Sequence, residues 1–309
     1  MKKIFCIGEL LVDFMGQSSQ GLVKSNQFAK FAGGAPANVA AAVSKLGGQA
    51  VFMGQVGQDS FGEYLLAALS ELGIDTHLCK REGKTTLAFV ALDAHGERDF
   101  EFYRGSDGDY QFADFELDNL NTEDIVHFGS ATALMGGRLR TSYFQLLEMA
   151  DANKNFISFD PNYREDLISA DMMANYLHDC KTFISYADVV KLSESEAQLI
   201  SGEDDLDKAL TYLQYVGAKT VIVTLGAKGS MIANAQGTRL IPSRKITQVD
   251  STGAGDAFVG ALLFKLAQHS EPNWDAFVAF ANLVGAFTCT NYGAIKSMPT
   301  MRQFLEFIN

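Results

Sequence analysis

A glycine-rich segment near the C-terminus combines residue types that bind anions with a carboxylate that can remove a proton. Residues 250–256 read D-S-T-G-A-G-D and precede an apolar pattern typical of a helix. Where a loop enters a helix, unpaired N–H groups and the positive end of the helix dipole stabilise a phosphate. Asp256 falls in the predicted first turn, so it is either a general base or an N-terminal cap.

Two better-known phosphate-binding motifs do not fit the sequence. Gly83-Lys84-Thr85 resembles the end of a Walker loop, but Leu78 stands where its first glycine is required. Gly253 and Gly255 begin a dinucleotide fingerprint, but Phe258 occupies the position of its third glycine. The anion site therefore belongs to neither class.

Two segments in the N-terminal part have the properties of a polyol site. Gly33 and Gly34 open a predicted helix that carries Asn38, whose amide can both donate to and accept from hydroxyl groups. Asp13 follows the first predicted strand, and ligands of open α/β sheets bind at the carboxyl ends of strands. The alternatives are a small-residue helix packed on a sheet and an exposed loop carboxylate.

The elements that would position these residues form an alternating pattern. Short apolar runs rich in β-branched residues alternate with amphipathic stretches, which predicts βα units in a mostly parallel sheet. The predicted strands are 4–7, 51–56, 125–128, 156–159, 189–192 and 220–224. The predicted helices are 36–46, 61–72, 141–150, 195–201, 206–216, 256–268 and 274–290.

Residues 13–32 and 84–110 interrupt this alternation. Residues 85–90 and 98–103 are predicted strands, joined by a turn at residues 94–96. We expect the two segments to form a small antiparallel sheet that acts as a lid over the site. The chain, residues 1–309, is then one domain with a lid. An exposed lid edge is a candidate surface for a homodimer.

Composition limits the partners of the protein. The chain has 309 residues and a net charge of -12, which argues against nucleic acid or an anionic membrane as the main partner. No apolar run reaches the length of about 18 residues needed to span a membrane. The four cysteines form no C-x-x-C pair and the five histidines share no metal-binding spacing, so we expect reduced thiols and a cytoplasmic location.

The motifs G-G-A-P-A-N-V-A at 33–40 and D-S-T-G-A-G-D-A-F at 250–258 together resemble those of the ribokinase-like (PfkB) carbohydrate kinases, nearest to the bacterial fructokinases. This resemblance covers the whole chain. It implies a three-layer α/β/α sandwich with a small β lid, ATP and Mg²⁺ as cofactors, and in many members a bound K⁺.

The resemblance also implies a role for each matching residue. Asp256 would be the base, and the N–H groups of Gly253, Ala254 and Gly255 the anion hole. The other implied roles are as follows: Asp13, Gly33, Gly34 and Asn38 bind the sugar; Glu194 holds Mg²⁺ through water; Lys191, Thr224, Gly226, Gly229, Asn282 and Ala286 line the nucleotide; and Asp250, Thr252, Asn291, Gly293 and Ser297 hold K⁺. Lys191 replaces the asparagine of the family's N-x-x-E motif.

Two segments bear on the choice of sugar. D-P-N-Y-R at 160–164 resembles the D-P-N-x-R signature of fructokinases and 2-keto-3-deoxygluconate kinases, so Arg164 would reach the substrate or phosphate, unless it pairs with Asp160 or Asp13. The predicted strand at 98–103 alternates, with Arg98, Phe100 and Phe102 on one face and Asp99, Glu101 and Tyr103 on the other. Phe100, Tyr103 and Arg104 are the candidates for selecting the sugar.

An acid sugar needs a positive clamp for its carboxylate. The sequence shows no further basic pair beyond Arg98, Arg104 and Arg164. We therefore favour fructose, phosphorylated at its 6-hydroxyl, over 2-keto-3-deoxygluconate and, third, aminoimidazole riboside. A protein of another class, a sugar-binding protein without activity, would not need the base or the anion hole.

Overall fold

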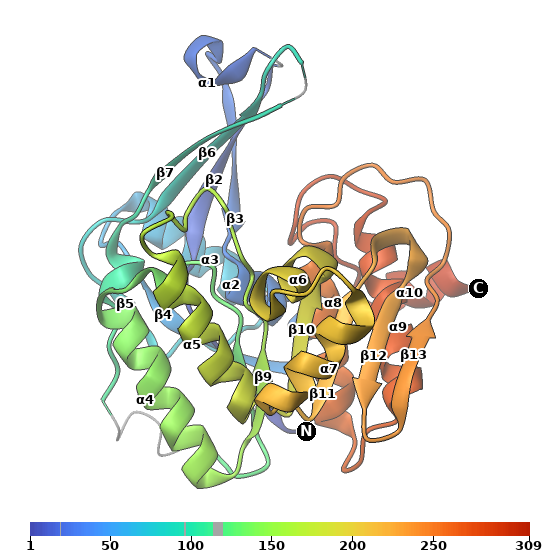
Figure 1. Ribbon diagram of the computed structural model, residues 1–309. Helices are drawn as coiled ribbons and strands as arrows, with labels where there is room; N and C mark the ends of the chain where they lie inside the picture. Colours follow the sequence, from blue (N-terminus) through green and yellow to red (C-terminus); the bar gives the residue numbers. More distant parts are fainter. Residues whose placement is uncertain (19, 96, 114–119) are drawn as a thin grey trace.

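A large sheet runs through the centre of the computed structural model, which describes residues 1–18, 20–95, 97–113 and 120–309 (Figure 1). Its order is β13-β12-β11-β10-β9-β8-β1-β4-β5, and all neighbours are parallel except the hairpin β11-β12-β13. The bounds are β1 Lys3–Ile7, β4 Gln49–Val56, β5 Cys79–Arg81, β8 Ile125–Phe128, β9 Phe156–Phe159, β10 Val189–Ser193, β11 Thr220–Thr224, β12 Ser230–Asn234 and β13 Gly237–Ile241.

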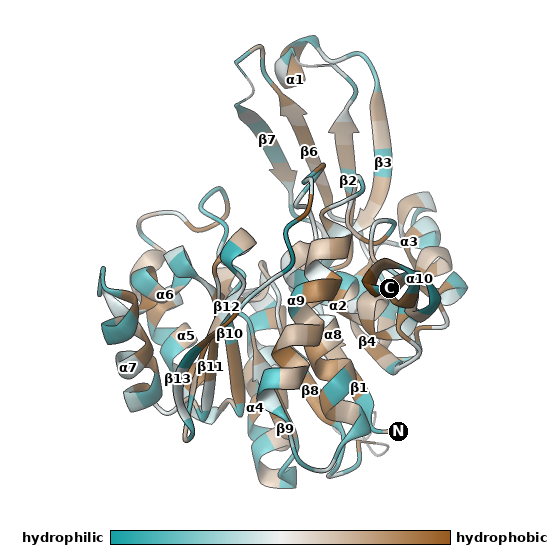
Figure 2. Cartoon of the chain, turned by 90° about the vertical axis from the view of Figure 1, so that its right-hand side faces the viewer, coloured by the Kyte–Doolittle hydropathy of each residue, from teal (hydrophilic) through white to brown (hydrophobic). Residues whose placement is uncertain are grey.

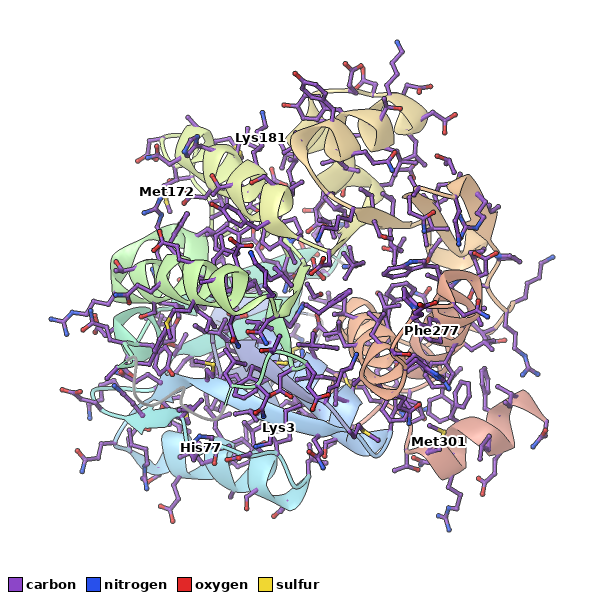
Figure 3. The ribbon with its side chains drawn as sticks, turned by 90° about the horizontal axis from the view of Figure 1, so that it is seen from below. Lys3, His77, Met172, Lys181, Phe277 and Met301 are labelled. Carbon is purple, nitrogen blue, oxygen red and sulfur yellow. The ribbon has the colours of Figure 1, made fainter. Side chains whose placement is uncertain are left out.

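Helices cover both faces of this sheet and make the three layers that were expected. One face packs against α2 (Ala35–Lys45), α3 (Ser60–Glu71), α8 (Ala254–Gln268), α9 (Trp274–Thr288) and α10 (Met301–Ile308). The other packs against α4 (Gly137–Asn153), α5 (Met173–Tyr186), α6 (Glu194–Ser201) and α7 (Leu206–Val216). Figure 3 shows Phe277 and Met301 on one side of the sheet and Lys181 on the other.

Strand β1 shows why these residues form a buried parallel strand. Ile4 and Cys6 face the first core while Phe5 and Ile7 face the second, so both sides of the strand are apolar.

All six predicted strands and seven predicted helices of the alternation are confirmed with small shifts of their ends. Helices α5 and α10 and the hairpin β12–β13 were not predicted.

The small sheet is formed by the two segments that break the alternation. It has the order β3-β2-β6-β7, with β2 Leu11–Gly16, β3 Phe28–Gly33, β6 Leu87–Leu92 and β7 Arg98–Tyr103, and it rises above the large sheet (Figures 1 and 2). Short helix α1 (Gly21–Lys24) lies at its tip. The turn predicted at 94–96 includes Gly96, which lies outside the described residues.

The small sheet is antiparallel, as expected, except at its centre. Strands β2 and β6 pair in parallel, whereas β2 pairs with β3 and β6 with β7 in antiparallel fashion. The chain leaves the large sheet twice from the same edge, so the outgoing strands of the two excursions run in the same direction. Each return strand is then antiparallel to its own outgoing strand.

The crossing of α2 and α8 brings the two motifs of the sequence together. A Cβ atom on Gly260 would lie 2.5 Å from the Cβ of Ala42 and 2.8 Å from the carbonyl oxygen of Val39. Only a glycine allows this approach. One turn earlier on each helix, Asn38 donates to Asp256 at 2.8 Å across 218 residues of sequence.

In the described part of the chain, no helix is both long and apolar enough to cross a membrane. All four cysteines are free thiols, and Cys6 and Cys180 are buried.

We predict that Gly260→Ala separates α2 from α8. The added methyl group should lower the free energy of unfolding by about 1–3 kcal/mol through overpacking, measured by urea denaturation. Activity should fall further than stability explains, because the bond between Asn38 and Asp256 lengthens. Adding Ala42→Gly removes the opposing methyl and should restore part of both losses. No recovery in the double variant would contradict a steric origin.

Candidate active site

Asp256 is a buried carboxylate at the start of α8. Gly253, at φ 75°, precedes the helix, and a side chain there would also lie 2.8 Å from the Cβ of Ala294. Asp256 is 8% exposed and accepts its bond from Asn38. Burial raises the pKa of Asp256, although the bond from Asn38 and the charge of Arg164 oppose the rise. A raised pKa makes the carboxylate a stronger base.

Lys191 lies beside the glycine segment, and its charge acts on Asp256. Its Nζ is 3.0 Å from Oδ2 of Asp160, and a Cβ built on Gly255 would lie 3.2 Å from the same Nζ. Burial alone would lower the pKa of Lys191, but the charges of Asp160 and Glu196 outweigh it and raise the pKa. A fixed ammonium group therefore adds to the positive end of α8.

The carboxylates around Lys191 differ from those that sequence reasoning selected. Glu194 is the first residue of α6 and is exposed, whereas Glu196 is 6% exposed. Glu196 completes a capping box with Ser193 and accepts from the N–H of Tyr163 at 2.7 Å. Glu196 and Asp160 were missed as site residues. The spacing S-x-x-E before an apolar run is the signal that points to Glu196.

The predicted sugar residues lie together at the carboxyl end of β1. The Oδ2 atom of Asp13 is so close to Gly33 that a Cβ there would lie 2.0 Å from it. Gly34, at φ 108°, lies against the carbonyl of Glu9, with 2.4 Å to a Cβ built on it. The Oδ1 of Asn38 is buried and has no hydrogen-bond partner among the described residues. This amide oxygen is placed to accept from a ligand hydroxyl next to Asp256.

The small sheet contributes one face to this region. Pairing of Asp13 with Ala88 and of Ala88 with Phe102 places Asp13, Phe102 and Phe100 on the same face. Phe100 and Phe102 have ring centroids 6.2 Å apart, which fits the predicted alternation. Tyr103 lies on the opposite face beside Phe89 and is 58% exposed. The structure thus brings Phe100, but not Tyr103, to the face of Asp13.

Arg104 and Arg164 occupy different surroundings. Arg104 donates to the carbonyl oxygens of Thr132 at 3.0 Å and Gly136 at 3.3 Å, so it fastens the base of the small sheet. Arg164 is exposed, and its charge reaches Asp256. The carboxylate of Asp160, an alternative partner for Arg164, is paired with Lys191. The side chain of Arg98 lies outside the described residues.

The predicted nucleotide residues follow β11 and line α9. Thr224 ends β11, and Gly226 and Gly229 form the turn into β12. Asn282 accepts from Ser230 at 2.7 Å and donates to the carbonyl of Ile241 at 3.0 Å. Its amide therefore holds the hairpin β12–β13 against α9, the helix that also carries Ala286.

Asp250 connects the glycine segment to the loop that follows α9. It accepts from the hydroxyl of Thr252 at 2.7 Å and from the N–H of Gly293 at 2.8 Å. Burial works against ionisation of Asp250, but these hydrogen bonds prevail and lower its pKa. Ser297 is buried and donates to the carbonyls of Gly293 and Ala294, while Asn291 is exposed. The ionised carboxylate and nearby carbonyls suit a monovalent cation.

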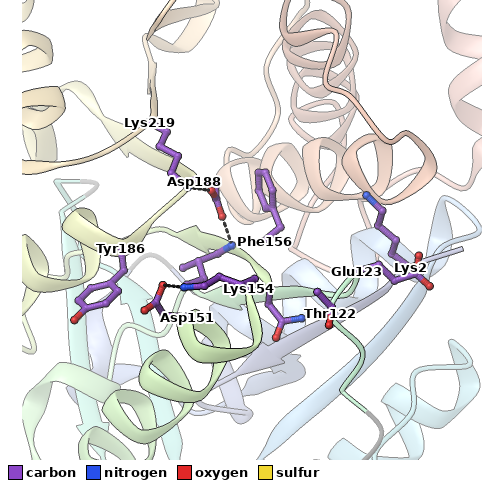
Figure 4. A pocket seen from close by; sticks show the side chains of 11 residues that line it. Lys2, Thr122, Glu123, Asp151, Lys154, Phe156, Tyr186, Asp188 and Lys219 are labelled. Carbon is purple, nitrogen blue, oxygen red and sulfur yellow. Dashed lines mark hydrogen bonds and ion pairs between the residues drawn. The ribbon is translucent and has the colours of Figure 1, made fainter.

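A second pocket lies at the amino ends of the strands of the large sheet (Figure 4). Two of its three lysines are paired, with Lys219 2.6 Å from Asp188 and Lys154 3.4 Å from Asp151, while Lys2 donates to the carbonyl of His269 at 3.0 Å. Ligands of parallel sheets bind at the opposite side, where the carboxyl ends of the strands lie. The chemistry therefore belongs with Asp256.

A parallel α/β fold with a buried carboxylate, a glycine-rich helix start and a fixed ammonium group is suited to transferring a phosphoryl group to a hydroxyl. The chain belongs to the pfkB family of carbohydrate kinases, whose pattern matches residues 1–301. The family, the fold and the kinase activity expected from the sequence are thereby confirmed.

Similar proteins cover the whole chain. Fructokinase-1 of Zea mays is 38% identical, over 99% of this chain and 97% of the relative. The crystal structure of fructokinase from Vibrio cholerae O395, bound to fructose, ADP and calcium ion, superimposes with a TM-score of 0.88 at 30% identity, covering 100% of this chain and 99% of that one. Aminoimidazole riboside kinase from Salmonella enterica, bound to aminoimidazole riboside and an ATP analogue, gives 0.86 at 26% identity, with 100% of both chains covered.

We predict that Asp256→Asn lowers kcat by roughly a hundred- to ten-thousandfold, since a general base acts in the transition state. Sugar affinity, measured by calorimetry, should change little. Stability at neutral pH should not fall. Because the pKa of Asp256 is higher in the folded than in the unfolded state, ionising Asp256 destabilises the folded protein. The wild type therefore loses stability as pH rises through the folded-state pKa. Equal losses of affinity and stability would instead indicate a structural role.

Proposed function

We propose that the protein transfers the γ-phosphoryl group of ATP to the 6-hydroxyl of D-fructose. The observation that carries the chemistry is the buried Asp256 between the open amide oxygen of Asn38 and the start of α8. The fructokinase relatives over the full chain favour fructose as the acceptor.

The proposed reaction divides its tasks among a few groups. Asp256 accepts the proton of the 6-hydroxyl while that oxygen bonds to the γ-phosphorus, and the bond to the bridging oxygen of ADP breaks. Backbone N–H groups of Gly253, Ala254 and Gly255 receive the charge of the transferring group. In the unliganded structure Ala254 N donates to the carbonyl of Ser251 at 3.1 Å, so binding would redirect it. The products are ADP and fructose 6-phosphate.

Lys191 and Arg164 would supply local positive charge in a protein whose net charge is -12. Lys191 would contact the nucleotide phosphates from its position beside Gly255. Mg²⁺, when bound with ATP, neutralises phosphate charge. Glu194 would hold it through water, and Glu196 is the buried alternative in the same segment. Thr224, Gly226, Gly229, Asn282 and Ala286 would form the wall for the rest of the nucleotide.

For the sugar we propose contacts on two sides. Asp13, Gly33, Gly34 and Asn38 would bind its hydroxyls from below, and the small sheet would close over it as a lid that presents Phe100. Tyr103 and Arg104 would act only through the shape of that sheet. The outer aromatic face with Phe89 and Tyr103 is the proposed surface for a homodimer, and the free thiols support a cytoplasmic location.

K⁺ is the proposed monovalent cation, held by Asp250, Thr252, Asn291, Gly293 and Ser297. The low pKa of Asp250 supports this because its carboxylate stays charged. The hydrogen bond from Gly293 to Asp250 would transmit occupancy of the site to the glycine segment.

A sugar panel tests the assignment. ADP release is coupled to a detection enzyme with fructose, 2-keto-3-deoxygluconate and aminoimidazole riboside, each in KCl and in tetramethylammonium chloride. We expect the highest kcat/KM with fructose and faster turnover in KCl. A higher kcat/KM for either other acceptor would reassign the substrate. Binding of a sugar without turnover would mean a sugar-binding protein, and equal rates in the two salts would exclude the cation site.

A further inference from the structure

A continuous network of buried hydrogen bonds joins the base of the small sheet to the start of α2. Its members are Thr86, Asp107, Thr132, Ser130 and Glu9, each at most 4% exposed. The proposed reaction assigns no role to any of them. Two carboxylates buried this deeply are costly unless their partners are well placed.

Asp107 fixes the small sheet at the point where its second excursion begins and ends. It accepts a short hydrogen bond from the hydroxyl of Thr86, just before β6. The same hydroxyl oxygen accepts from the N–H of Gly105, just after β7, at 2.8 Å. Arg104 adds its bond to the carbonyl of Thr132. One carboxylate thus ties both strands to the loop after β8.

Thr132 continues the network toward the large sheet. Its hydroxyl donates to Oδ2 of Asp107 at 2.8 Å and lies 3.5 Å from Oε2 of Glu9. Ser130 accepts from the N–H of Thr132 at 3.2 Å and donates to the same Oε2 at 2.5 Å. Thr132 therefore bridges the two carboxylates, with its hydroxyl bonded to Asp107 and its N–H bonded to Ser130, which in turn donates to Glu9.

Glu9 ends the network at the sugar side. Its Oε1 accepts from the N–H of Ala35, the first residue of α2, at 3.0 Å. Gly34 packs on the backbone of Glu9, and Asn38 is one turn further along α2. Burial raises the pKa of Glu9 to about 7, although the bond from Ser130 opposes the rise.

We propose that Glu9 and Asp107, bridged by Thr132, are positioning residues that hold the small sheet in register with the start of α2. This inference rests on the proposed function, in which Asp13 and Asn38 bind the sugar from two sides. The coupling keeps these two residues at the separation that lets one sugar contact both. Breaking it loosens sugar binding and leaves the phosphoryl-transfer groups in place.

A double-mutant cycle with Thr132→Val and Thr86→Val tests the coupling. Each single variant should raise the KM for fructose about tenfold, with kcat and the KM for ATP within about threefold of the wild type. Because both act through Asp107, the double variant should be no worse than the poorer single one. Thr132→Ser keeps the hydroxyl and should restore the KM. The control Thr220→Val alters a buried threonine at the other edge of the sheet.

The proposal is overturned if the two effects on KM multiply, if kcat falls instead of KM rising, or if Thr220→Val raises KM as much. Amide exchange in the unliganded protein gives a second readout that needs no sugar. Thr132→Val should speed exchange at both Gly105 and Ala35 and leave β10 and β11 unchanged. Faster exchange at only one of the two would overturn the coupling. Failure of the wild type to phosphorylate fructose would overturn only the proposed substrate.

Discussion

The hydrogen bond between Asn38 and Asp256 depends on how closely α2 can approach α8, and the rest of the site depends on that bond. Both helices cover the same face of a parallel sheet, so both begin at its carboxyl edge. Gly260 and Ala42 remove the side-chain bulk that would hold the helices apart. Two motifs at opposite ends of the sequence thereby meet, and in the proposed reaction α2 carries the sugar side and α8 the anion side.

Electrostatics explains how a chain of net charge -12 can bind a polyanionic nucleotide. The positive elements are local: the start of α8, the ammonium of Lys191 and the exposed guanidinium of Arg164. Asp160 holds Lys191 in place, and the two charges act on Asp256 in opposite directions: Asp160 raises its pKa and Lys191 lowers it. Burial raises the pKa of Asp256, and the positive charges of Arg164 and Lys191 limit the rise.

The sequence predicted elements whose signal is local. Apolar β-branched runs identified the central strands, and glycines next to a helical pattern identified the anion site. Features that depend on tertiary contact were missed or mistaken. Helix α5 is an exception, because Tyr176, Cys180 and Phe183 are buried at helical spacing and gave a local signal that was overlooked. The hairpin β12–β13 has short strands, and β13 is largely exposed. The parallel pairing of β2 with β6 depends on where two separate excursions leave the sheet.

The same limit applied within the site. Asp256 and Asn38 stand in glycine-rich motifs that are visible in one sequence, and the structure joins them. Asp160 becomes a site residue only through its contact with Lys191, 31 residues away. Glu196 differs from Glu194 in burial and in its capping-box contacts, and in the sequence only its spacing from Ser193 points to that difference. Arg104 and Tyr103 follow Phe100 closely in sequence, yet the twist and pairing of β7 direct each to a different neighbour.

The pH dependence of kcat in Lys191→Met is the most direct test of Asp256 as a base under electrostatic control. Ionised Asp256 is the active form, so removing the nearby positive charge should raise its pKa and move the acid limb of the profile to higher pH. The control Lys219→Met removes a lysine that is paired with Asp188 at the amino ends of the strands. It should leave the acid limb unchanged. An unmoved acid limb in Lys191→Met would contradict the proposed arrangement of base and ammonium group.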